Sequence, residues 1–429
     1  MRILEVSRYK NNFANHQLPF VTEQGEAIAQ ELRKLDNGHL TLDNGASAVE
    51  YFLVKGNYVT AVRELKKKIR EFKPDIVHAH YGLSAITAEL QGLVPVVTTF
   101  HNGETLNRSV NLMSSLMSLR AKHVIYVAQH IRDLSYFKAK NYSIIPCGVP
   151  MDQMNITTKE EARKQLGWSD DKKYILFGGA FSNLRKNYPL LRDAVELLEE
   201  NKNIDKHCCA EINNENNIDI NKKDIKKNEE LSDTFSIPNN LDQMTAQEQA
   251  LGQSSAQSCS IDSVAQTRSN NSSQKMPKNA KNIWTPINDG EQYGDIVCIE
   301  MKGLSRAECV LRMCACDLFA LPSHSEGSPQ ALKEAMACNC PCIATDIADV
   351  RELFGDEPGH WILRNPRKTH ERWDGDEKSL DEMVKLLNEA LKYKGRTRGR
   401  ERILELGLSN EQVAKRTIAI YNAIIKKEK

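Results

Sequence analysis

Apolar runs and amphipathic stretches alternate along most of the chain, as they do where strands and helices follow one another. The apolar runs predict strands at 1–6, 76–82, 94–100, 122–128, 173–179, 318–321 and 342–345. Apolar residues at helical spacing predict helices at 20–28, 62–72 and 373–394, with further helices opening at 328–329 and at 409. This alternation predicts an α/β fold built on parallel sheets.

The clearest strand–turn–helix–strand unit lies between Asp317 and Asp346. The apolar run 318–321 is followed by the polar turn 323–327. Ser328 is expected to cap the next helix, with Pro329 at its first position. A stripe of apolar residues predicts the buried face of this helix: Ala331, Leu332, Ala335 and Met336.

The start of this helix predicts an anion site. Free N–H groups and the positive end of the helix dipole favour negative charge there, and Ser328, Gln330 and Ala331 can donate where Pro329 cannot. Open parallel sheets bind ligands beyond the carboxyl ends of their strands. We therefore expect a ligand that carries phosphate.

Two acids flank the same helix start. Glu326 lies in the turn and Glu334 lies in the helix, with seven residues between them. Periodicity alone favours a solvated helix-face carboxylate for Glu334. For Glu326, a loop acid stabilised by the helix dipole and a ligand-binding acid are equally compatible with the spacing.

The run 326–337 resembles the E-x7-E motif of the retaining GT-B glycosyltransferases of family 4. The resemblance implies that Glu326 contacts hydroxyls of the donor sugar, with Gly327 beside it, and that Glu334 holds the ribose of the nucleotide. It also implies two Rossmann-like domains with parallel sheets that face a cleft. A carboxylate suits both roles because it accepts two hydrogen bonds from adjacent hydroxyls.

Two segments in the first half of the chain also resemble this family. The first is 75–82 (DIVHAHYG) and the second is 94–103 (VPVVTTFHNG). The resemblance implies that His101 lies at the sugar end of the cleft; without it, a loop histidine at a strand end would be favoured. His78 and His80 share one strand face. No acid stands near them at a spacing typical of a metal site, so we expect them to line the cleft.

The diphosphate clamp is the third point of resemblance. In the family, an arginine follows the glycine strand and a lysine comes six residues later. Lys186 matches the lysine, whereas Ala180 stands at the arginine position, and Arg185 could substitute because a guanidinium matches phosphate geometry. A solvated loop pair is the alternative for Arg185 and Lys186. The chain also has Gln17-Leu18-Pro19 where relatives carry a glycine loop near the phosphates.

Length and composition set the outer limits. At 429 residues the chain is too long for one ordinary core. We expect a first domain at 1–150, joined by the final helix at 409–429, and a second at 151–408 that binds the nucleotide-sugar. Within the second, the segment 203–289 is rich in Asn, Gln, Ser and Lys, and is expected to be a disordered insert.

Charge and targeting signals bear on location and partners. The formal net charge of +1 gives no overall field that would favour nucleic acid. No run reaches membrane-spanning length, and the first residues read as a strand rather than a signal peptide. We expect a cytoplasmic protein. The basic face of 62–72, with Lys66, Lys67, Lys68 and Arg70, is either a solvated surface or a peripheral contact with the inner membrane.

The 11 cysteines do not suggest a disulfide framework, because their number is odd and no export signal is present. The C-x-C spacings at 314–316 and 338–342 differ from the C-x2-C of structural zinc sites. We expect small core residues and free thiols, and no metal site.

These features together predict a glycosyltransferase that moves a sugar from a nucleotide-sugar, with UDP or GDP as the expected nucleotide, to a hydroxyl of a glycan or lipid-linked acceptor. No cofactor is expected. A non-catalytic or degenerate GT-B binding protein and a GT-B epimerase or phosphorylase are the alternatives. A dehydrogenase is disfavoured because no G-x-G-x-x-G follows a predicted strand.

Overall fold

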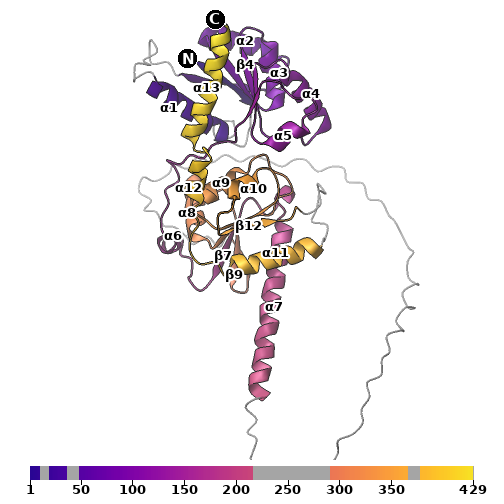
Figure 1. Ribbon diagram of the computed structural model, residues 1–429, viewed down its shortest axis with the longest axis vertical. Coiled ribbons are helices and arrows are strands. Elements are labelled where there is room, and N and C mark those ends of the chain that lie inside the picture. The colour runs from indigo at the N-terminus through magenta and orange to yellow at the C-terminus, as the bar shows by residue number, and fades with distance from the viewer. Residues whose placement is uncertain (10–18, 36–47, 216–289, 366–376, 429) are drawn as a thin grey trace, which may run out of the picture. The chain divides into compact units, whose positions relative to one another are not determined.

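The computed structural model describes residues 1–9, 19–35, 48–215, 290–365 and 377–428, and side chains in 205–215 are not described (Figure 1). Contacts divide the chain into a unit of Met1–Lys206 with Pro286–Lys429, which holds both sheets, and a unit of His207–Thr285. The division into two domains near residue 150 stays a prediction.

The first sheet is parallel throughout and has the strand order β2-β1-β3-β4-β5-β6. Its strands are β1 (Ile3–Arg8), β2 (Val49–Val54), β3 (Ile76–His80), β4 (Val96–Phe100), β5 (His123–Tyr126) and β6 (Tyr142–Ile144). The helices that accompany it are α1 (Pro19–Leu35), α2 (Ala61–Phe72), α3 (Gly82–Leu90), α4 (Arg108–Ser118), α5 (Gln129–Leu134) and α13 (Asn410–Glu428).

Both faces of the first sheet are covered. One face packs on α1 and α13, which lie side by side in Figure 1, through Ile28, Val413 and Tyr421. The other face packs on α2 and α3, with Leu65 and Ala85 in that core. The parallel strands are therefore buried on both sides, as a parallel sheet requires.

The second sheet has the order β12-β11-β10-β7-β9-β8 and is parallel except for the antiparallel edge strand β8. Its strands are β7 (Lys173–Phe177), β8 (Gly290–Tyr293), β9 (Ile296–Glu300), β10 (Leu318–Leu321), β11 (Cys342–Thr345) and β12 (His360–Leu363). Its helices are α6 (Lys159–Leu166), η1 (Leu184–Lys186), α7 (Tyr188–Glu215), α8 (Arg306–Ala315), α9 (Gln330–Ala337), α10 (Val350–Phe354), α11 (Glu377–Ala390) and α12 (Gly399–Glu405).

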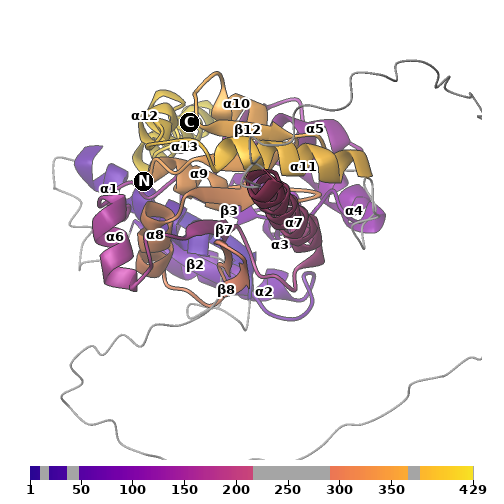
Figure 2. The same ribbon diagram turned by 90° about the horizontal axis from the view of Figure 1, so that it is seen from below.

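The faces of this sheet are also both covered. Residues of α7 and α11 pack on one face, as Figure 2 shows. Residues of α6, α8, α9, α10 and α12 form the core on the other face. Six of the eight described cysteines are buried, and all eight are free, as the sequence predicts. Among the described helices, none is both long and apolar enough to cross a bilayer.

Helix α7 corrects one expectation. It continues to Glu215 and so enters the segment predicted to be disordered from residue 203. The reason is local: no Gly or Pro follows Pro189 before Glu215, so nothing in the sequence interrupts the helix. The expectation for 216–289 lies outside the described residues.

Candidate functional site

Each sheet has one point where the strand order reverses, and the candidate site residues lie there. In the first sheet the chain continues from β1 to β2 on one side and to β3 on the other. In the second sheet β7 has β9 on one side and β10 on the other. Ligands of open α/β sheets bind at such switch points, beyond the carboxyl ends of the strands.

One face of the first sheet becomes polar toward the carboxyl ends of its strands. Alternate residues share a face, so Ile76 is followed by His78 and His80. On β1, Glu5 follows Ile3 in the same way, and the parallel register pairs Glu5 with His78. The expectation that the two histidines line the cleft is wrong, because both are fully buried, and the acid beside them comes from a neighbouring strand rather than from a nearby position in the sequence.

Glu5 is fully buried against both histidines. Its Oε2 lies 2.7 Å from His80 Nε2 and 3.4 Å from His78 Nδ1. Tyr421 of α13 contacts the same cluster, with its hydroxyl 2.6 Å from His78 Nδ1, and Thr99 Oγ1 lies 2.7 Å from His78 Nε2. Burial raises the pKa of Glu5, but His78 and His80 outweigh burial and hold it at about 2. Glu5 is therefore a carboxylate at neutral pH.

Glu5, His78 and His80 form the one group of three metal-ligating side chains found among the described residues. Two ligands of a tetrahedral zinc ion, each about 2.0–2.1 Å from the metal, lie about 3.3 Å apart. The 2.7 Å between His80 Nε2 and Glu5 Oε2 is shorter than that and is a hydrogen-bond distance. The geometry therefore fits a proton between these two atoms.

His101 continues the same polar face just beyond β4. Its Nε2 lies 3.1 Å from His80 Nδ1, and its ring packs against both Phe20 and Tyr81, with centroids 4.9 and 4.8 Å away. Burial, reinforced by His80, places the pKa of His101 well below its usual value. His101 is therefore a neutral, rigidly held imidazole.

The backbone around His101 is strained and anchored. Tyr81 and Asn102 have φ angles of 70° and 108°, which side-chain-bearing residues rarely adopt. The buried Glu104 accepts hydrogen bonds from the N–H groups of Gly82, at 2.9 Å, and of Asn102, at 3.0 Å. Such conformations persist only where surrounding contacts enforce them, and they are typical of functional sites.

At the switch point of the second sheet, Glu326 lies between two cations. Its carboxylate is 2.7 Å from Lys186 Nζ and 3.3 Å from an Arg185 nitrogen. Burial raises the pKa of Glu326, but the charges of Lys186 and Arg185 outweigh burial and lower it below its usual value. Lys186 is therefore a largely buried ion-pair partner, 14% exposed, whereas Arg185 pairs with the same carboxylate from a side chain that is 42% exposed.

Two glycines allow this close arrangement. A Cβ on Gly179 would lie 2.9 Å from Lys186 Cγ, so a side chain there would displace the lysine. A Cβ on Gly327 would overlap the carbonyl of His101 and lie 3.0 Å from Asn102 Cβ. Gly327 thus lets the loop that carries Glu326 lie directly against the loop that carries His101.

The start of α9 differs from the sequence prediction. Pro329, not Ser328, is the N-cap, with extended backbone. The Ser328 hydroxyl instead donates to Asp349 Oδ2 at 2.6 Å and accepts from Lys333 Nζ at 3.1 Å. The buried Asp349 and Lys333 thus use the side chain that would otherwise cap the helix.

The N–H groups of Gln330 and Ala331 open α9 without a hydrogen-bond acceptor in the part of the chain that the structure describes. They can therefore donate to a ligand. The apolar stripe on this helix is confirmed, since Leu332, Ala335 and Met336 are fully buried.

Glu334 is not a solvated helix-face carboxylate. Its side chain is 13% exposed, and its Oε1 lies 2.7 Å from an Arg306 nitrogen. Arg306 also pairs with Glu23 of α1, and Gln330 Nε2 lies 3.4 Å from Glu334 Oε1. The other carboxylate oxygen of Glu334 has no such contact among the described residues, so it can accept from a ligand hydroxyl.

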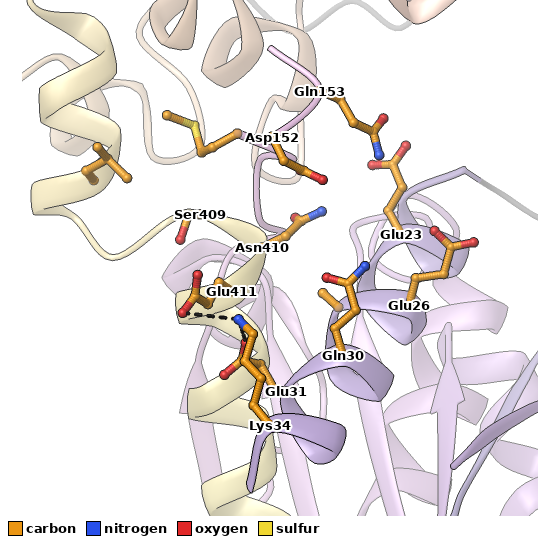
Figure 3. Close-up of a pocket in the computed structure, with 13 residues that line it drawn as sticks. Glu23, Glu26, Gln30, Glu31, Lys34, Asp152, Gln153, Ser409, Asn410 and Glu411 are labelled. Carbon is orange, nitrogen blue, oxygen red and sulfur yellow. Dashed lines mark hydrogen bonds and ion pairs between the residues drawn. The ribbon is translucent and has the colours of Figure 1, made fainter. Parts of the chain in front are cut away.

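Glu23 also borders a pocket of about 360 Å³ between α1 and the start of α13 (Figure 3). Figure 3 shows the side chains of Glu23, Glu26 and Gln30 along α1, opposite Asp152 and Asn410. The lining carries five carboxylates and a single lysine: Glu23, Glu26, Glu31, Asp152, Glu411 and Lys34. This acidic lining would repel phosphate.

Several residues of the site carry no motif signal. Glu5 could have been noticed because it is a charged residue in an otherwise apolar run. Arg306 gave no such signal, since its helix start, with a Ser305–Glu308 capping box, looks purely structural. The Gln17-Leu18 departure lies outside the described residues.

Two family models match the chain. "Glycosyltransferase Family 4" matches residues 28–153, which include His101, and "Glycosyl transferases group 1" matches residues 299–375, which include Glu326 and Glu334. A putative teichuronic acid biosynthesis glycosyltransferase of Bacillus subtilis, TuaC, is 24% identical over 308 residues. That alignment covers 67% of this chain and 57% of the relative's length.

Solved structures agree on the fold. Sucrose-phosphate synthase from Thermosynechococcus elongatus matches with a TM-score of 0.59 at 12% identity and covers 100% of both chains. Anabaena HepE in complex with UDP matches with a TM-score of 0.54 at 12% identity, covering 99% of this chain and 100% of that one. The expected GT-B fold is confirmed, and the chain is similar in sequence to the family 4 and group 1 glycosyltransferases.

Proposed function

We propose that the protein transfers a sugar from a nucleotide-sugar to a hydroxyl acceptor, with retention of the anomeric configuration. The observation that carries this proposal is the position of Glu326, a buried carboxylate between Lys186 and Arg185 at the switch point of the second sheet. A carboxylate for sugar hydroxyls and two cations for phosphates stand side by side there. Retention rests on the resemblance of the motif.

The proposed diphosphate contacts are electrostatic. Lys186 and Arg185 would exchange part of their contact with Glu326 for phosphate oxygens, and Gln330 and Ala331 would donate their N–H groups. Together they stabilise the charge that develops on the leaving nucleotide. In this proposal Arg185 takes the role of the family arginine that Ala180 replaces, and no metal ion is needed.

The proposed contacts with the sugar and with the ribose lie on either side of the diphosphate contacts. Glu326 accepts from sugar hydroxyls, and His101 lies beside it because Gly327 packs on the His101 backbone. Glu334 accepts from the ribose through the oxygen that Arg306 leaves open. Ser328 contributes by its N–H alone, since its hydroxyl is engaged by Asp349.

UDP is the proposed nucleotide, with GDP as the alternative. Support comes from Anabaena HepE, whose structures contain UDP and UDP-glucose. The proposed acceptor is a hydroxyl of a glycan or lipid-linked glycan, which is supported by the teichuronic acid assignment of the Bacillus relative. We further propose that the protein acts in the cytoplasm.

A peripheral membrane contact is also part of the proposal. Helices α2, α3 and α4 are neighbours on one side of the first sheet, and α2 presents its basic face there. On and beside α4, Leu112, Met113, Leu116 and Leu119 are each 40–49% exposed. Cations beside exposed leucines suit an anionic bilayer surface.

Sedimentation with vesicles tests this contact. The protein should pellet with vesicles that contain anionic lipid, and Leu112→Ser/Leu116→Ser should reduce the bound fraction. Ala423→Ser, at an exposed position of α13, is the matched control. Equal binding of all three proteins would sink the proposed surface.

The transfer itself is tested with purified protein and a panel of UDP-, GDP- and ADP-sugars, followed by thermal shift. A selective rise in melting temperature would identify the donor, because a ligand that binds only the folded state stabilises it. Nucleotide release on adding a glycan acceptor, with the product anomer assigned by NMR, then tests transfer with retention.

The alternatives give different outcomes in the same assay. Donor binding without nucleotide release in the presence of acceptors would indicate a binding protein. Release of free sugar without an acceptor product would indicate an epimerase, and sugar phosphate formed in phosphate buffer would indicate a phosphorylase. No shift with any donor would contradict the proposal.

A further inference from the structure

A line of hydrogen bonds runs from the buried Glu5 to His101. Glu5 Oε2 lies 2.7 Å from His80 Nε2, and His80 Nδ1 lies 3.1 Å from His101 Nε2. His101 Nδ1 in turn lies 3.6 Å from Cys147 Sγ. Both ring nitrogens of His80 and of His101 have a hydrogen-bonding partner. Each hydrogen bond needs one donor and one acceptor, so the protonation of one group determines that of the next.

The chemistry of each group fixes that direction. An ionised carboxylate can only accept, so the proton between Glu5 and His80 is carried by His80 Nε2. A neutral imidazole has one N–H, which leaves His80 Nδ1 as an acceptor for the Nε2–H of His101. His101 Nδ1 then carries a lone pair, toward which the Cys147 thiol can donate.

Burial keeps both rings neutral. Burial lowers the pKa of His80, and His78 lowers it further, against the opposing effect of Glu5. For His101, burial and the neighbouring His80 act in the same direction. A second proton on either ring is therefore disfavoured at neutral pH.

We propose that Glu5 is a positioning residue that acts through His80 to hold His101 in the Nε2–H tautomer, so that His101 offers the lone pair of Nδ1 to the site. In the donor complex, a sugar hydroxyl would donate to Nδ1 in place of the Cys147 thiol. This role rests on the proposed function, whereas the tautomer itself does not.

The tautomer of His101 matters for ligand binding because the residue lies next to Glu326. Its backbone lies against Gly327, next to Glu326, and the rings of Phe20 and Tyr81 restrict rotation of the imidazole. The ring therefore cannot exchange its two nitrogens freely. The carboxylate of Glu5, which does not itself contact the ligand, therefore determines which ring nitrogen of His101 accepts a hydrogen bond.

Two-bond proton–nitrogen NMR correlations of ¹⁵N-histidine-labelled protein test the tautomer without any ligand. Wild type should show His101 with a protonated Nε2 and a bare Nδ1, assigned by comparison with His101→Gln. The opposite tautomer, or an imidazolium, at neutral pH would overturn the proposal. So would a change in the His80 signals on adding a chelator, because a metal would then take the place of the proton.

Glu5→Gln tests the control exerted by Glu5. The amide can donate or accept, so both tautomers of His80, and with them of His101, become accessible. The His101 signals should move toward those of a mixture, and kcat should fall tenfold to a hundredfold. Glu5→Asp, which keeps the charge, should retain the wild-type tautomer and recover part of kcat.

Glu89→Gln is the matched control. Glu89 is a buried carboxyl of α3, and burial raises its pKa to about 8. It therefore carries a proton at neutral pH, and the neutral amide of glutamine resembles this protonated form. Neither the His101 signals nor kcat should change in this variant. If Glu5→Gln leaves both unchanged as well, the positioning role is wrong. If wild type has the expected tautomer but transfers no sugar, the proposed function fails instead.

Discussion

At the scale of single residues, the most informative group is the buried carboxylate of Glu326. Two cations hold its pKa below the usual 4.5. The unfolded chain then binds the proton more tightly, so this group contributes stability above about pH 4.5, and that contribution is lost as the pH falls through the folded-state pKa.

Glu326→Gln should therefore change the pH dependence of stability. The free energy of unfolding should drop by about 1–3 kcal/mol at pH 7, because a charged hydrogen-bonding partner is lost. The difference from wild type should shrink as the pH falls below about 4.5, the ordinary value of the carboxyl. Urea unfolding from pH 7 to pH 3 measures both curves, and parallel curves would contradict the ion pair.

For Glu334 we predict an effect on ligand binding rather than on stability. Glu334→Ala should weaken nucleotide-sugar binding about 10- to 100-fold, which corresponds to the loss of about 1.5–3 kcal/mol of hydrogen bonding to a charged group. Isothermal titration calorimetry measures the change. Glu389→Ala, an exposed carboxylate on α11, should bind as wild type does. Unchanged donor affinity in Glu334→Ala would exclude the ribose role.

At the scale of elements, α3 and α4 make an unusually close contact. A Cβ on Gly82 would overlap Ser114 of α4 and lie 2.9 Å from the Phe100 ring. Gly82→Ala should lower the free energy of unfolding by about 1–3 kcal/mol, as overpacking does. Urea unfolding measures the loss.

The double variant Gly82→Ala/Ser114→Gly tests the cause. Removing the Ser114 side chain opens space for the new methyl group, so the double variant should lose less stability than the sum of the two single variants. The Ser114→Gly single variant should itself cost about 0.5–1 kcal/mol through helix propensity. Strict additivity would show that the two positions do not share a steric constraint.

Most elements could be predicted because their signals are local. The strand at 318–321, the start of the final helix at Ser409 and the stripe Leu332/Met336 are all where the sequence places them, and a hydrogen bond from the Gln412 N–H to the Ser409 hydroxyl helps to fix that start. The prediction that Ser328 caps α9 was wrong, because the buried Asp349 and Lys333 bind its hydroxyl, which the local sequence does not reveal.

The candidate site was predictable only where a motif marked it. Glu326, Lys186 and Arg185 come together as expected, from segments 140 residues apart. Glu5 and Arg306 act through partners on other elements, which no spacing along the chain reveals. Ala348 shows the same limit, because its φ of 53° lies in a region that favours glycine and nothing in the local sequence indicates it.

At the scale of the whole molecule, the cores of both sheets are formed by residues outside 207–285 as far as the structure describes them. Replacing 207–285 with a short Gly/Ser linker should therefore leave one cooperative thermal transition with a melting temperature within a few degrees of wild type. Circular dichroism at 222 nm follows the transition. Its loss would mean that this segment stabilises the fold.

Helix α13 also has a consequence for how the molecule is made. It completes the core around Ile3, Ile76 and His78, yet it begins at Asn410, whereas the last strand of that sheet ends at Ile144. A ribosome that adds about 5–20 residues per second needs on the order of ten seconds or more to cross that interval. During translation α1 already covers part of that face, but the part that α13 covers stays exposed until the last helix emerges.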